Sequence, residues 1–314
     1  MEAIGLLGHC VCSVALRRAE GDGDTLIPNA SPMPKPPQAS PRANPAADAA
    51  LNRAAAALRA GRADEAERLA MSVLKANRGH AGAALVLAQA LGAQNRLAEA
   101  VPVLQRIARA SGDPKFETLL ASALAADGRT DDALAQLRQI VARRPPFPPA
   151  FAEYANLLGT SGDTAKAIAV LEEALTLAPG EIPLMQQLAA LYQSAHARDK
   201  ARALLQRAFD SAQNRPDLAA ALARIAMRDG DYPAAIDLLR RALALHPADA
   251  MTRTDLAVGL FETGDREAGE AALRRALRDQ PALLGRVTHV LAGTPHGRFF
   301  LRPSAAAAFL KRSS

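Results

Sequence analysis

Two runs of apolar residues at helical spacing lie between Pro216 and Asp249. A turn sequence, Gly-Asp-Tyr-Pro at residues 230–233, separates the two runs, and Pro247 ends the second one. The pattern predicts a helix, a tight turn and a second helix within one unit. Two such helices cannot bury both of their apolar faces alone, so the unit is expected to stack on neighbouring units.

The same pattern recurs from residue 47 to residue 283. The predicted repeats are 47–80, 81–113, 114–147, 148–181, 182–215, 216–249 and 250–283. Position 8 of the repeat is Ala54, Ala88, Ala121, Ala155, Ala189, Ala223 and Ala257. Position 20 is Ala66, Ala100, Ala133, Ala167, Ala201, Ala235 and Gly269, and position 24 is Ala70 and then leucine in every later repeat. Small residues at positions 8 and 20 allow two helix backbones to approach closely, and leucine at position 24 fills the space beside them.

This register resembles the tetratricopeptide repeat family, which favours small residues at positions 8, 20 and 27, a bulky residue at position 24 and proline at position 32. Proline occupies position 32 in four repeats, as Pro145, Pro179, Pro247 and Pro281. The tryptophan that the family places at position 4 is absent, because the chain contains none. The resemblance implies an all-α, right-handed superhelical solenoid of helix-turn-helix repeats.

Each predicted turn inside a repeat carries a residue suited to a left-handed helix end. These residues are Gly61, Asn95, Gly128, Gly162, His196, Gly230 and Gly264. Turn geometry explains them, and they form no phosphate-binding motif.

The two ends of the chain depart from the repeat pattern. Residues 1–46 are expected to be disordered, because residues 21–45 hold seven prolines with several Ser, Asn and Gly residues and read as a linker. The apolar stretch at residues 1–16 precedes the basic pair Arg17 and Arg18, whereas a secretory signal has the reverse order. We therefore expect a cytoplasmic protein and leave export through an atypical signal open. Residues 284–314 are predicted to form a C-terminal helical cap.

The net charge of +6 lies mostly in the C-terminal tail. Residues 284–314 hold five basic residues and no acidic one, whereas the repeats are nearly neutral. This distribution argues against a nucleic-acid-binding solenoid. The segment 298–302 interleaves Arg and Phe and leaves stacking on single-stranded nucleic acid as an alternative. We prefer packing of Phe299, Phe300 and Leu301 on the open end of the last repeat, because a solenoid needs a cap.

No catalytic, metal or cofactor motif is recognisable in the sequence. The two cysteines, Cys10 and Cys12, have no zinc-site spacing, and the six histidines are scattered. The neighbouring acids Glu172 and Glu173 are expected on a solvated helix face, where paired carboxylates do not separate their pKa values. No apolar run reaches the length of a membrane span. The chain is therefore predicted not to be an enzyme and to need no cofactor.

In the tetratricopeptide family the first helix of each repeat lines a concave groove, chiefly through positions 2, 5, 9 and 12. The resemblance assigns partner contacts to Gln89, Ser122, Asn156, Gln186, Gln193, Arg224 and Arg228, the last at position 13. It also places Thr118 and Thr254 at position 5 and Phe261 at position 12 in the groove. The lysine and asparagine set with which chaperone-binding members clamp a terminal carboxylate is missing here.

The predicted function is that of a non-catalytic scaffold that binds a protein or peptide segment in this groove. Two alternatives stay open. One is an accessory subunit of a bacterial envelope, secretion or polysaccharide-export system. The other is a partner or remnant of a repeat-fused transferase.

Overall fold

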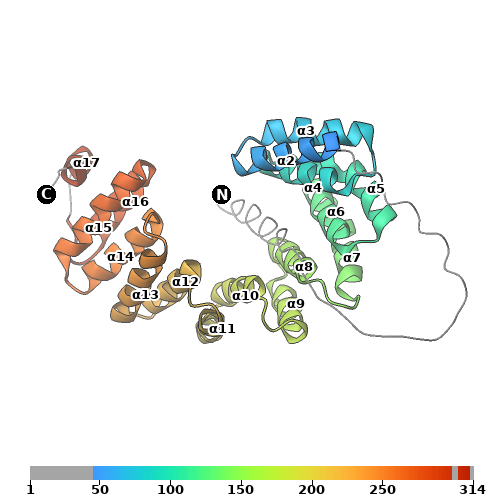
Figure 1. Ribbon diagram of the computed structural model, residues 1–314. Coiled ribbons are helices and arrows are strands. Elements are labelled where there is room, and N and C mark those ends of the chain that lie inside the picture. The colour runs from blue at the N-terminus through green and yellow to red at the C-terminus, as the bar shows by residue number, and fades with distance from the viewer. Residues whose placement is uncertain (1–44, 299–302, 312–314) are drawn as a thin grey trace, which may run out of the picture. The chain divides into compact units, whose positions relative to one another are not determined.

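The computed structural model describes residues 45–298 and 303–311. Within these ranges the chain forms α-helices and two short 3-10 helices and contains no strand (Figure 1). The predicted all-α fold of helix-turn-helix repeats is confirmed. The predictions of a disordered segment and an atypical signal at the N-terminus concern residues that lie almost entirely outside these ranges.

The chain divides into two compact units, Met1–Ala178 and Pro179–Ser314. The described helices of the first unit alternate between first and second helices of the repeats. They are α2 (Pro45–Arg59), α3 (Ala63–Ala76), α4 (Ala81–Ala93), η1 (Leu97–Ala100), α5 (Val101–Ser111), α6 (Pro114–Ala126), α7 (Thr130–Val141), α8 (Pro148–Thr160) and α9 (Thr164–Leu177).

The second unit continues the same alternation and ends in two further helices. Its elements are α10 (Ile182–Ser194), α11 (Arg198–Ser211), α12 (Pro216–Arg228), α13 (Tyr232–Leu245), α14 (Ala250–Glu262), α15 (Arg266–Asp279), η2 (Pro281–Leu283), α16 (Leu284–Gly293) and α17 (Pro303–Lys311). The even-numbered helices from α4 to α14 begin at the first residues of the predicted repeats. We retain the division into repeats over 47–283 and a cap over 284–314 as a proposal.

The residues at positions 8, 20 and 24 form the core of each repeat. All seven alanines at position 8 are at most 2% exposed, and the leucines at position 24 are as deeply buried. In the repeat 216–249, Ala223, Ala226, Ala235 and Leu239 form one buried cluster across α12 and α13. The core is thus built from many small contacts between helices.

The turns within the repeats have the predicted left-handed backbone. The φ angles range from 58° at Asn95 to 88° at Gly162, and His196 has a φ of 59°. Glycine adopts this conformation without a Cβ clash, and asparagine tolerates it better than other residues. The following second helix then begins at a capping residue in several repeats, as where Asp231 accepts a hydrogen bond from the backbone N–H of Ala234.

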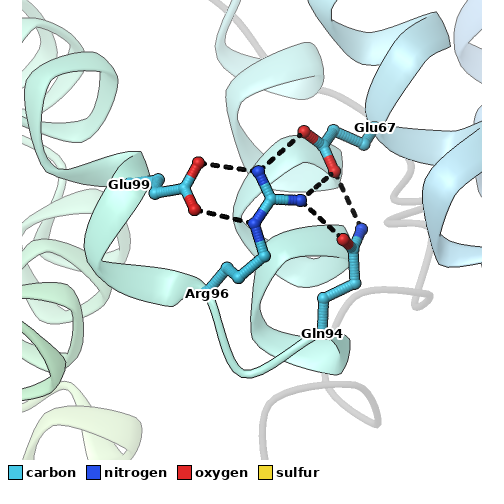
Figure 2. Close-up of polar contacts among 4 residues, drawn as sticks. All are labelled: Glu67, Gln94, Arg96 and Glu99. Atoms are coloured by element: carbon cyan, nitrogen blue, oxygen red, sulfur yellow. Dashed lines mark hydrogen bonds and ion pairs between the residues drawn. The ribbon is translucent and has the colours of Figure 1, made fainter.

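A polar cluster around Arg96 connects the first two repeats of the first unit (Figure 2). Arg96 donates from Nε to Glu99 Oε1 at 2.7 Å and from Nη1 to Glu67 Oε2 at 3.0 Å. Gln94 donates to the same carboxylate of Glu67 at 2.8 Å. The hydrogen bond to Arg96 holds the pKa of Glu99 below its ordinary value. Glu67 on α3 thereby fixes the turn that precedes α5.

Helix α16 covers the open end of the last repeat in the second unit. Val287 and Leu291 are fully buried and pack in one cluster with Phe261 and Leu273. Leu310 of α17 joins this cluster. Phe299, Phe300 and Leu301, which we expected to pack at this end, lie outside the described residues.

Two arginines hold α17 in place. The guanidiniums of Arg274 and Arg298 lie over the ring of Phe309, at 4.8 and 4.9 Å from its centre. Both arginines also bond to the buried carboxylate of Glu270, at 3.2 Å from Arg274 and 2.5 Å from Arg298. Cation–π contacts and one shared carboxylate therefore connect α15, the segment before α17, and α17 itself.

Candidate functional site

Polar side chains at equivalent places on successive first helices contact each other in the second unit. Gln186 on α10 donates to Asp217 Oδ2 on α12 at 2.8 Å. Arg228 at the end of α12 donates to Gln193 Oε1 on α10 at 2.8 Å. The structure thus brings the predicted residues Gln193 and Arg228 together, and it joins Gln186 to an acid that the prediction did not include.

Further along the same row, Asp255 on α14 bonds to two arginines. Its Oδ2 accepts from Arg224 Nε on α12 at 3.1 Å, and its Oδ1 accepts from Arg286 Nη2 on α16 at 3.0 Å. The Asp255 side chain is only 8% exposed, whereas those of Arg224 and Arg286 are 48% and 49% exposed. The buried carboxylate of Asp255 therefore binds two half-exposed guanidiniums, and the three side chains come from three different helices.

The sequence separations explain how this row arises. Gln186 and Asp217, Arg224 and Asp255, and Asp255 and Arg286 are each 31 residues apart. This distance is one repeat less about one helical turn, because neighbouring first helices are staggered along their axes. In these three pairs a residue of one helix contacts a residue about one turn earlier in the next repeat, whereas Gln193 and Arg228 are 35 residues apart.

In the first unit, Gln89, Ser122 and Asn156 lie half-buried on α4, α6 and α8. Ser122 donates to the backbone carbonyl of Thr118 at 3.2 Å and is hydrogen-bonded to Glu153 on α8. Burial raises the pKa of the Glu153 carboxyl, and the hydrogen bond to Ser122 opposes that rise. Ser122 and Glu153 are also 31 residues apart, so the first unit uses the same stagger.

Three residues that the resemblance placed in the groove are buried instead. Thr254 is 0% exposed and Thr118 is 7% exposed. Their hydroxyls donate to backbone carbonyls one turn earlier, so each hydroxyl has its hydrogen-bond acceptor within its own helix. Phe261 is also 0% exposed and packs between α14 and α15. Positions 5 and 12 therefore do not face solvent in every repeat of this chain.

The prediction missed Asp217, Asp255 and Arg286, although a signal for them exists. Each lies 31 residues from another polar residue of a first helix, a separation that the repeat length alone does not suggest. Arg286 was assigned to the cap, yet it extends the row of polar contacts. A search for polar pairs one repeat less one turn apart identifies all three residues.

We next consider metal sites, membrane spans and histidine contacts among the described residues. Among them, no group of three or more His, Cys, Asp or Glu side chains is placed to hold a metal ion. None of the helices within 45–298 and 303–311 is long and apolar enough to cross a membrane. Two histidine side chains contact main-chain groups. His80 Nδ1 accepts a hydrogen bond from the N–H of Ala83 at the start of α4. His296 Nδ1 lies 2.7 Å from the carbonyl oxygen of Phe261.

Comparison with known sequences identifies the family. One sequence model of the tetratricopeptide repeat matches residues 57–123, 160–225 and 226–287, and a second matches residues 118–182. These matches cover well over half of the chain, which therefore belongs to the tetratricopeptide repeat family. No curated protein matches the sequence.

Several solved structures are similar to this chain. The structure of the APC/C hetero-tetramer Cut9–Hcn1 aligns with 84% of this chain and 55% of its own, with a TM-score of 0.51 and 15% identity. A thermophilic TPR protein from Thermus thermophilus is 25% identical over 56% of this chain and 97% of its own, with a TM-score of 0.46. YrrB, described as a TPR protein with an unusual peptide-binding site, is 17% identical over 57% and 92%, with a TM-score of 0.46.

Membership of this family supports a general role in protein–protein interaction. Proteins built from these repeats are typically non-catalytic scaffolds.

Proposed function

We propose that the chain is a non-catalytic adaptor that binds an extended segment of a partner protein along the exposed face of its first helices, in the concave groove of the family. One observation carries the proposal. Polar side chains on α10, α12, α14 and α16 contact each other in pairs from one of these helices to the next and form a polar row across them. A row that crosses several helices matches an extended ligand better than a compact one.

The side chains of the row suit recognition of a peptide main chain. An amide both donates and accepts hydrogen bonds, as a peptide backbone does. The structure shows Gln193 accepting from Arg228 through Oε1, which leaves its Nε2 group to donate to a partner carbonyl. Arg228 is thereby fixed in orientation beside it. We propose as partner contacts Gln89, Ser122, Asn156, Gln186, Gln193, Arg224 and Arg228.

A peptide-display selection tests this proposal. Random dodecapeptides are selected against the immobilised full chain, and the affinity of the selected peptides is measured by fluorescence anisotropy. Gln193→Ala and Asn156→Ala are expected to weaken binding by about two- to tenfold, the effect of one lost hydrogen bond.

Two amides on second helices serve as matched controls. Gln206 on α11 and Gln139 on α7 are exposed, so Gln206→Ala and Gln139→Ala remove the same group from the other layer of helices. These variants are expected to keep the affinity of the wild type. Equal losses in the groove variants and the controls contradict the proposed face.

A further inference from the structure

We propose that Arg224 and Arg286, held by the buried carboxylate of Asp255, form a docking site for an acidic side chain of the bound segment. The inference rests on the proposed function and names the chemistry of the partner at one point of the row. It also extends the binding face beyond α14 to α16, which the sequence assigned to the cap.

The hydrogen-bond inventory leaves donors available at this point. A guanidinium carries five N–H donors, and Arg224 uses its Nε group on Asp255 while Arg286 uses Nη2. Both oxygens of Asp255 are occupied, each by one arginine. The remaining N–H groups of the two half-exposed arginines are therefore free to bind a further acceptor.

The charges at the site do not cancel. Two guanidiniums and one carboxylate leave one excess positive charge, and a single arginine is enough to neutralise Asp255. Asp217, at the start of α12, is already paired with Arg215 at 2.6 Å. One excess positive charge suits a monoanion such as a carboxylate better than a doubly charged phosphate.

The buried carboxylate also fixes the arginines before a partner binds. Free arginine side chains lose considerable rotamer freedom when they are immobilised at an interface. Here Asp255, with 8% of its side chain exposed, already restrains both guanidiniums. Pre-organised guanidinium groups favour bidentate binding of a carboxylate. We therefore assign the site to a glutamate or aspartate side chain of an extended peptide that follows the row of first helices.

The test uses the full chain and four synthetic peptides with acetylated N-termini. The probe is a decapeptide of alternating glutamate and serine with an amidated C-terminus. In the second peptide glutamine replaces each glutamate. The third is the glutamine peptide with a free C-terminal carboxylate, and in the fourth phosphoserine replaces each glutamate. Affinities are measured by isothermal titration at low and at physiological salt.

The wild type is expected to bind the glutamate peptide at least about tenfold more tightly than the glutamine peptide, with a preference that decreases as salt rises. Arg224→Gln and Arg286→Gln are each expected to reduce this preference by about threefold or more. Each variant leaves Asp255 one guanidinium, so the buried charge stays paired. Circular dichroism and the thermal midpoint verify that both variants fold.

The matched control is Arg240→Gln on α13, which removes the same charge from an exposed second-helix position. It is expected to leave the preference within about twofold, because a distant exposed charge is largely screened. A preference that survives unchanged in Arg224→Gln and Arg286→Gln overturns the site. Equal affinity for the glutamate and glutamine peptides does so as well.

The remaining outcomes separate other ligands from the proposed one. Tightest binding of the peptide with the free C-terminus, or of the phosphoserine peptide, with sensitivity to the same arginines, overturns the assignment to an acidic side chain. If peptides from the display selection bind Arg224→Gln and Arg286→Gln as tightly as the wild type but lose affinity for Gln193→Ala, the acidic site fails and the proposed function stands. If the selection yields no peptide sensitive to the first-helix variants, both fail.

Discussion

The ring of Phe261 on α14 occupies the space that a Cβ on residue 269 of α15 would need. An ideal Cβ built on Gly269 lies 2.8 Å from the nearest ring carbon, and Phe261 is completely buried. Gly269 stands at position 20, where the other six repeats have alanine. In the last repeat, the absence of a methyl group at Gly269 thus leaves the space that the ring of Phe261 fills.

We predict that Gly269→Ala destabilises the protein by about 1–2 kcal/mol. The added methyl group must displace the ring of Phe261, which is fully buried and cannot move out into solvent. The free-energy cost of this overpacking exceeds the gain in helix propensity. The change is measured by urea unfolding. The double variant Gly269→Ala/Phe261→Leu is expected to lose less stability than the sum of the losses in the two single variants, because the two side chains compete for one space.

Gly92→Ala provides the control for this prediction. Gly92 lies in α4, and apart from its chain neighbours and the backbone of its own helix no atom lies within 4 Å of a Cβ built on it. The substitution is expected to stabilise the protein by about 0.5–1 kcal/mol through helix propensity alone. Stabilisation by both Gly269→Ala and Gly92→Ala would show that the ring of Phe261 yields easily.

Glu153 makes stability depend on pH in a direction opposite to that of an ordinary paired acid. Burial raises the pKa of its carboxyl in the folded state above the unfolded value of about 4.3. The folded state therefore binds more protons between these two pKa values. The contribution of Glu153 to stability is fully present below the unfolded pKa and is lost as pH rises through the folded pKa.

Glu153→Gln is accordingly expected to be more stable than the wild type at pH 7, with an advantage that shrinks as the pH falls towards about 4. Urea unfolding at several pH values measures the difference. Ser122→Ala removes the hydrogen bond that opposes the pKa shift and is expected to raise the pKa of Glu153 further. A Glu153→Gln variant that is less stable than the wild type at pH 7 contradicts the direction of the shift.

Glu270 connects the last repeat to α17 through Arg274 and Arg298, which lie over the ring of Phe309, and it also pairs with Arg266. Its side chain is 7% exposed and lies 3.4 Å from Arg266, 3.2 Å from Arg274 and 2.5 Å from Arg298. Glu270→Gln is expected to destabilise the protein by about 1–3 kcal/mol, because the largely buried Arg274 loses its charged partner. Hydrogen exchange is expected to show the first loss of protection in α17.

Glu267→Gln on the same helix is the control for Glu270. Glu267 is exposed in the first turn of α15, so the substitution removes the same charge with a small effect on stability. Equal effects of the two substitutions would indicate that the overall charge of α15 matters rather than the arginine cluster.

The parts of the fold that follow from one repeat were predictable from the sequence. A residue at a left-handed turn or at a close helix contact is restricted by its immediate neighbours, so Gly128 and Ala155 reveal their roles through residue type and spacing alone. Both predictions were confirmed, the first by a φ of 80° and the second by complete burial.

The features that depend on two repeats together were not predictable in the same way. Asp255 meets Arg224 and Arg286 because neighbouring first helices are staggered by about one turn, and the stagger is a result of packing. Phe261 was expected to face the groove, yet it turns inward because Gly269 leaves room for its ring.

Hydrogen exchange of the full chain with and without a peptide from the display selection tests the central claim most directly. The proposed face predicts that the peptide increases protection in α10, α12, α14 and α16, whose side chains form the polar row, and leaves the second helices α11 and α13 unchanged. Protection confined to the second helices, or spread evenly over both layers, would contradict binding along the first helices.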